Sequence, residues 1–101
     1  MSEDTIQTDG NGFFMERGGK RIAELHFRLK GNDLEGHHTW VDPEFRGGDH
    51  ARRLVQALVD RARSEHRKVI PTCPYIRKTF ERTPAYADVV KAPDNGTRGQ
   101  A

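Results

Sequence analysis

The sequence predicts an α+β domain with a mixed sheet, and two periodicities and their order carry this prediction. Residues 12–41 show strand-like runs separated by short turns, which indicates an antiparallel three-strand meander. Residues 50–66 have helical periodicity, and a short strand-like run follows at residues 68–73. A strand, a crossover helix and another strand place the last strand parallel to the third. A second helix is expected to follow.

The meander depends on alternation and on glycine turns. The Gly-Gly pair at residues 18–19 is a hairpin signal between the first two runs. Residues 20–29 then alternate with period two, so one face of this strand is expected to lie in the core. Its apolar side chains are Ala23, Leu25, Phe27 and Leu29. A turn at residues 31–32 leads into a third run at residues 33–41.

The helices are predicted from spacing. Small and apolar residues recur along one stripe of the first helix, at Ala51, Leu54, Val55, Leu58, Val59 and Ala62. The second helix is expected to begin at Pro74, because proline is favoured in a first turn. Its buried side is expected to comprise Tyr75, Ile76, Thr79 and Phe80. The Thr83-Pro84 pair ends it.

Length and composition predict one small domain. The chain has 101 residues, and we expect a flexible lead at residues 1–11, a single domain at residues 12–91 and a disordered tail at residues 92–101. One cysteine excludes an intramolecular disulfide and favours a reducing, cytoplasmic location. No apolar run approaches the roughly 20 residues of a membrane span.

Charge and histidine spacing predict neither a nucleic-acid partner nor a metal. The formal net charge is only +2, and the arginines of the first helix are spread around it rather than gathered in one stripe. The five histidines show no metal-ligand spacing. His37 and His38 are adjacent in a strand and therefore point to opposite faces.

The segment that joins the third strand to the first helix is the most informative part of the chain. It is basic and rich in glycine, and it leads directly into a helix start, where unpaired amides and the helix dipole favour anions such as phosphate. An ordinary strand-to-helix connection has a similar composition. Asp49 is also a favoured N-cap, and its carboxylate is able to occupy the same amides. The sequence leaves these two interpretations open.

Several motifs follow in a characteristic order: the Gly-Gly hairpin, His38-Thr39-Trp40-Val41, Pro43 to Gly47, Pro71 to Tyr75, and Tyr86 to Asp88. In this order, over residues 12–90, the chain resembles the small single-domain GNAT-type N-acetyltransferases of the YjdJ-like branch. The resemblance implies a compact GNAT-like fold and an acetyl-CoA-dependent N-acetyltransferase that acts on an amine or a protein lysine. The alternative is a catalytically weak or inactive acyl-CoA-binding or interaction module with the same fold. We expect a monomer or a weak homodimer.

The resemblance also implies site residues. Those expected to hold acetyl-CoA are Val41, Arg46, Gly47, Gly48, Asp49, His50, Ala51 and Arg52. Asp49 stands where the family has glycine, and a carboxylate there repels a pyrophosphate. Trp40 stands where the family usually has glutamate.

Cys73 and His38 are the predicted catalytic residues. The Cys73 thiol precedes the second helix, whose N-terminus stabilises a thiolate. His38 resembles the family's active-site histidine and is a candidate general base. Acetyl transfer is expected either directly to the amine or through acetyl-Cys73. A lone cysteine is also typical of a small residue in a protein core.

Overall fold

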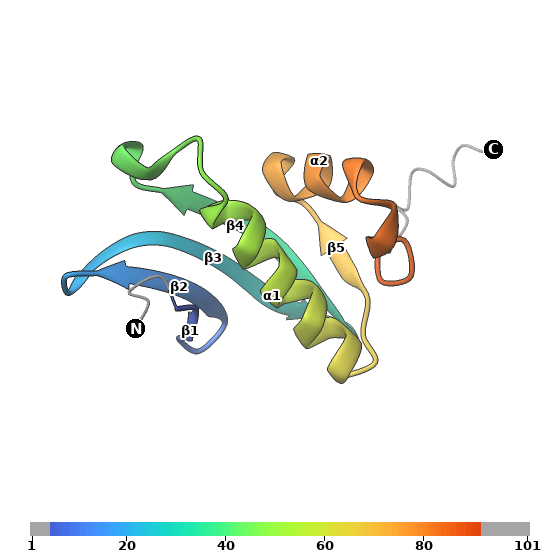
Figure 1. Cartoon of the computed structure of the whole chain (residues 1–101). Coiled ribbons are helices and arrows are strands. Elements are labelled where there is room, and N and C mark those ends of the chain that lie inside the picture. Colours follow the sequence, from blue (N-terminus) through green and yellow to red (C-terminus); the bar gives the residue numbers. More distant parts are fainter. Residues whose placement is uncertain (1–4, 92–101) are drawn as a thin grey trace.

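The computed structural model describes residues 5–91 and shows a single sheet with helices on one side (Figure 1). The expected tail at residues 92–101 and the first four residues of the expected lead lie outside the described residues. The strands are β1 (Gln7–Thr8), β2 (Gly12–Arg17), β3 (Lys20–Lys30), β4 (Asp33–Val41) and β5 (Val69–Pro71). The helices are α1 (His50–Ser64) and α2 (Pro74–Arg82), with short 3₁₀ turns η1 (Pro43–Phe45) and η2 (Pro84–Tyr86).

The sheet has five strands in the order β1-β2-β3-β4-β5. The pairs from β1 to β4 are antiparallel, and β5 runs parallel to β4. The predicted α+β class, with a meander, a helix, a parallel strand and a second helix, is confirmed. The expected N-terminal lead contains a short strand, because Gln7 and Thr8 pair with β2.

Both α-helices pack on the same face of the sheet. A Cβ atom built on Gly36 of β4 would lie 3.1 Å from Leu58 of α1 and 2.7 Å from Ile76 of α2. The predicted stripe of α1 is buried from Leu54 to Ala62, together with Ile76, Thr79 and Phe80 of α2. The protein therefore has two layers, with one core between the sheet and the helices.

Two expected core residues are exposed. Leu29 is 58% exposed, because it lies at the end of β3 beside the turn into β4, where the helix layer no longer covers the strand. Tyr75 is 39% exposed, because the start of α2 borders an open cleft rather than the core. Alternation and helical spacing predict to which face a side chain points. They do not predict how far the helix layer covers the sheet, or the sheet covers the helices.

Two β-bulges change which residues face the helices. One shift of register lies between Met15 and Glu16 and leaves Ile22 of β3 as the extra residue, so that Ile22 and its neighbour Ala23 are both buried. The other lies between His26 and Phe27, where His37 is the extra residue in β4. A bulge moves the residues beyond it to the opposite faces. Consequently Thr39 and Val41 share the helix face with Gly36, and His38 and Trp40 lie on the other face.

Candidate functional site

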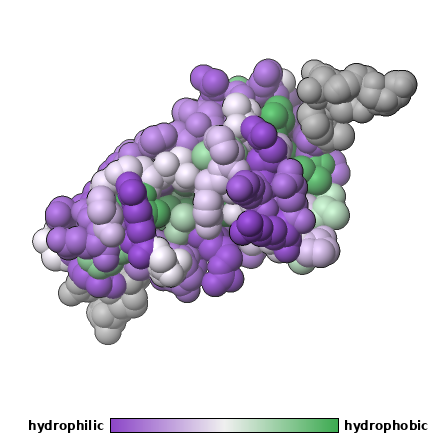
Figure 2. Space-filling view, turned by 90° about the horizontal axis from the view of Figure 1, so that it is seen from above, coloured by the Kyte–Doolittle hydropathy of each residue, from purple (hydrophilic) through white to green (hydrophobic). Residues whose placement is uncertain are grey.

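The main candidate site is a cleft where β4 and β5 diverge. The two strands pair only between Leu34–Gly36 and Val69–Pro71, so the last residues of β4 have no β5 neighbour. The cleft has a volume of about 350 Å³. It is lined by Thr39, Trp40, Val41, Phe45, Arg46, Gly47, Gly48, His50, Ala51 and Tyr75. Seen from above, the mostly hydrophilic surface has a paler strip of less polar residues across its middle (Figure 2).

The loop between β4 and α1 is held in one shape by its own contacts. Asp42 Oδ1 accepts a hydrogen bond from the Glu44 amide at 2.9 Å, and this bond, with Lys20 nearby, lowers the pKa of Asp42. Arg46 Nε donates to the carbonyl oxygen of Val41 at 2.9 Å. The loop is therefore closed on itself beside the cleft. Gly47 has φ +94°, a backbone conformation that glycine adopts without strain.

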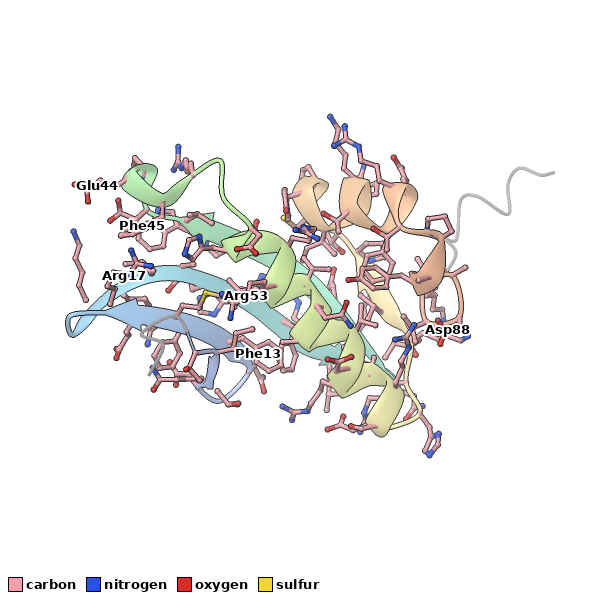
Figure 3. All side chains as sticks on the ribbon, viewed as in Figure 1. Phe13, Arg17, Glu44, Phe45, Arg53 and Asp88 are labelled. Atoms are coloured by element: carbon pink, nitrogen blue, oxygen red, sulfur yellow. The ribbon has the colours of Figure 1, made fainter. Side chains whose placement is uncertain are left out.

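An aromatic contact joins this loop to the β2–β3 hairpin. The Arg17 guanidinium lies 4.7 Å from the centroid of the Phe45 ring, and the two side chains meet at the same end of the sheet (Figure 3). The Phe45 ring in turn meets the His50 ring edge-on, with centroids 5.6 Å apart. These contacts fix the mouth of the cleft relative to the first turn of α1.

The N-terminus of α1 opens toward this cleft. Asp49 is the N-cap residue, and its side chain makes no capping hydrogen bond. The Asp49 carboxylate therefore does not occupy the first amides of α1, which was one of the two interpretations left open by the sequence. The first amides of a helix have no intrahelical acceptor. With the positive end of the dipole they form a suitable seat for a phosphate group.

Most residues predicted to hold the cofactor border this cleft. The lining residues include Val41, Arg46, Gly47, Gly48, His50 and Ala51. Asp49 and Arg52 are exposed at the same helix start but are not among the lining residues. For all eight residues, contact with a cofactor stays a prediction. Thr39, Phe45 and Tyr75 line the cleft but were not predicted from the sequence. The available signal was the aromatic residues beside the glycine loop and after Cys73-Pro74.

Cys73 lies behind the cleft wall. It is the N-cap residue of α2, is 7% exposed, and its side chain makes no capping bond. Its Sγ lies 3.5 Å from Oγ1 of Thr39, a lining residue. The backbone amide of Cys73 donates to the Gly36 carbonyl oxygen at 3.0 Å, which anchors the start of α2 on β4. The Cys73 thiol therefore contacts a residue that lines the cleft but does not line the cleft itself.

The structure does not bring His38 to Cys73. His38 lies on the face of β4 opposite to the helices, and half of its side chain is exposed. Its Nε2 is 3.8 Å from Oε2 of Glu24, and its ring centroid is 5.4 Å from that of His26. Thr39, the next residue, contacts Cys73 on the other face. The catalytic roles of Cys73 and His38 stay predictions.

A second hollow lies at the outer edge of β5. It has a volume of about 590 Å³, and its lining includes Ile70, Phe80 and Lys91. None of the predicted site residues lines it.

Within residues 5–91 no group of His, Cys, Asp and Glu side chains is arranged to hold a metal ion. No helix in that range is long and apolar enough to cross a membrane.

Comparison with known proteins decides the family. The family described as GCN5-related N-acetyl-transferase matches residues 12–89. The chain belongs to this family. The predicted resemblance to GNAT-type proteins is thereby confirmed. No curated protein gave a significant match to this sequence.

Among solved structures, an NMR structure of a GCN5-like protein from Staphylococcus aureus is similar over nearly the whole chain. The TM-score is 0.77 at 27% identity, covering 92% of this chain and 93% of the other. A ribosomal-protein-alanine N-acetyltransferase from Brucella melitensis shares the fold at TM-score 0.57 and 19% identity, covering 81% and 62% of the two chains. N-acetylglutamate synthase from Neisseria gonorrhoeae, solved with coenzyme A, matches at TM-score 0.54 and 18% identity, covering 58% of this chain and 15% of the synthase chain.

Proposed function

We propose that this GNAT-family protein transfers an acetyl group from acetyl-CoA to a primary amine, either a small amine or a protein lysine. The observation that carries the proposal is the cleft at the diverging end of β4, which meets the N-terminus of α1 while Asp49 leaves the first amides uncapped. Family membership supports acetyl-CoA as the donor. The single cysteine is consistent with a reducing, cytoplasmic location.

The residues of the cleft suit the parts of acetyl-CoA. The first turn of α1 and the loop at Gly47 and Gly48 offer backbone amides to the pyrophosphate. The edge of β4 at Thr39–Val41 is not paired with β5. Apart from the Val41 carbonyl oxygen, which accepts a hydrogen bond from Arg46, this edge offers backbone groups to an extended, amide-containing arm. The side chains of Phe45 and Tyr75 supply apolar surface on the two sides of the cleft.

Acetyl-CoA supplies an activated acetyl thioester: the amine forms a C–N bond as the C–S bond breaks, the amine loses a proton, and coenzyme A leaves as the thiol. In this chain backbone donors of β4 stabilise the oxygen that becomes negative. His38 or a water molecule takes the proton from the amine. Burial of Cys73 behind Thr39 favours direct transfer over a route through acetyl-Cys73.

One experiment tests the proposal in two stages. Acetyl-CoA is expected to raise the melting temperature of the protein, since it binds the folded state. An acetyl-transfer assay with a panel of amines is then expected to show release of coenzyme A. Absence of any thermal shift contradicts acetyl-CoA binding. The Cys73→Ala variant separates the two routes, because retained turnover excludes the covalent one.

A second candidate function is an acyl-CoA-binding or interaction module without significant catalysis. The placement of Cys73 and His38 on opposite faces of β4 favours it, as does Trp40 in place of a carboxylate. A thermal shift with acetyl-CoA, but no release of coenzyme A with any amine, selects this candidate.

A further inference from the structure

The face of the sheet opposite to the helices carries an organised group of polar and aromatic side chains. Cross-strand register places Phe14, Glu24 and Trp40 in one row and His26 and His38 in the next. Both α-helices lie on the other face, as the surroundings of Gly36 show. We call these five residues the open-face cluster.

The open-face cluster meets the cleft at Trp40. Thr39 and Trp40 are consecutive residues of β4, so their side chains point to opposite faces, yet both line the cleft. Both residues lie where β4 has no β5 neighbour, so the cleft and the open face meet at this edge of the sheet. A molecule on the open face beside Trp40 is therefore adjacent to the cleft that holds the cofactor in our proposal.

Glu24 supplies negative charge beside this opening. It lies directly opposite Trp40 in the register, a position where Cβ atoms are roughly 5 Å apart. Its Oε1 contacts the Arg21 guanidinium at 3.2 Å, and that guanidinium lies over the Phe14 ring, 4.0 Å from its centroid. Arg21 is thus held on the β2 side of Glu24.

The other oxygen of Glu24 faces the histidines. Its Oε2 is 3.3 Å from Nε2 of His26 and 3.8 Å from Nε2 of His38. The longer distance is not a hydrogen bond, so this oxygen is able to accept a further donor on the side of β4. The Glu24 side chain is 22% exposed, which leaves it accessible to a ligand.

We propose that the open-face cluster is the acceptor site, with Glu24 as the ion-pair partner of the incoming ammonium group and Trp40 as the surface for its aliphatic arm. This proposal builds on the acetyl transfer proposed above. A primary amine is protonated near neutral pH, and a carboxylate is its strongest partner in proteins. An ammonium group with its methylene chain also packs favourably against an indole ring. The site therefore selects cationic, lysine-like amines over neutral or acidic acceptors.

The test is an NMR titration of the whole chain with Nα-acetyl-lysine amide, in the presence and absence of coenzyme A. Coenzyme A carries no acetyl group, so no turnover occurs during the titration. The chain has a single tryptophan, so the indole N–H signal reports Trp40 without ambiguity. The indole signal and the amides around Glu24 and His38 are expected to shift. Glu24→Gln is expected to weaken the apparent affinity at least ten-fold, and Glu24→Asp is expected to retain most of it. Glu16→Gln, which removes a carboxylate on β2, is the matched control and is expected to have no effect.

The proposal is overturned by shifts confined to the helix face, by the absence of any shift at millimolar probe, or by unchanged affinity in Glu24→Gln. Self-association that covers Trp40, seen by sedimentation, also overturns it. Coenzyme A binding is read in the same titration from amides at the start of α1. Amine binding without coenzyme A binding contradicts the proposed function but supports the site, and coenzyme A binding without amine binding contradicts only the site. The amide spectra of the variants show whether each is folded.

Discussion

The two ends of β4 differ in what borders them. Over Leu34–Gly36 the strand pairs with β5, and Gly36 lies against Leu58 and Ile76. Over Thr39–Val41 β5 has diverged, and the same strand borders a cleft. The comparison shows that the paired end of β4 contributes to the stability of the fold, whereas its other end borders the candidate binding site. Strand pairing closes one end, and its loss at the other end leaves backbone groups and space for a ligand.

The closed end is most sensitive to added volume at Gly36. In Gly36→Val the new side chain enters space already occupied by buried side chains of both helices. We expect the free energy of unfolding to fall by about 3 kcal/mol, the upper range for overpacking. Urea denaturation measures this. Ala87→Val, at an exposed position, is the control. A loss no larger than that of the control would show that the two helices move apart easily.

The closed end also contains a buried carboxylate that makes stability depend on pH. Glu35 accepts hydrogen bonds from Thr72 and from Arg28 Nε, and these lower its pKa below the usual 4.5. A lowered pKa in the folded state stabilises the protein above pH 4.5, and this contribution is lost as the pH falls through the folded-state value. Glu35→Gln is expected to lower the unfolding free energy by about 1.5 kcal/mol at neutral pH.

This difference between wild type and Glu35→Gln is expected to shrink in denaturation curves measured below pH 4.5, because the wild-type carboxylate is protonated first in the unfolded state and only at lower pH in the folded state. Glu81→Gln, on the exposed surface of α2, is the control and is expected to behave like wild type. A constant difference at all pH values would exclude ionised Glu35 as the cause.

The open end is expected to respond in binding more than in stability. Gly47 has φ +94°, so Gly47→Ala strains the loop by about 1 kcal/mol. Because the loop borders the cleft, we expect a roughly ten-fold loss of acetyl-CoA affinity in calorimetric titration, equivalent to about 1.4 kcal/mol. Gly31→Ala, with φ +64° in the β3–β4 turn, is the matched control. Equal affinity in both variants would place the binding site away from this loop.

The smallest expected effect concerns Asp49. Its carboxylate stands at the start of α1 without capping it, beside the predicted phosphate seat. Asp49→Asn is expected to raise acetyl-CoA affinity about three-fold, because one exposed charge near a helix end contributes roughly 0.3–1 kcal/mol. Added salt should reduce this gain through screening. Asp60→Asn, near the other end of α1, is the control, and an equal gain there would indicate a general charge effect.

Apart from the short strand β1, the sequence alone predicted the order of the strands and α-helices, the antiparallel meander and the parallel crossover, and the structure confirms them. It did so because hydrophobic periodicity is a local property that each element carries in its own residues. The glycine loop before α1 was also predicted from the sequence, by its glycine and arginine residues directly before a helix start. The buried stripe of α1 needed only the spacing of its apolar residues.

The tertiary structure decided which face each site residue occupies. The extra residue at His37 places His38 and Trp40 on the open face and Thr39 on the helix face, which separates His38 from Cys73. It also decided where pairing with β5 stops and the cleft begins. Bulges and strand divergence depend on the partners of a strand and on the layer packed above it, and the residues of one strand do not encode these by their spacing.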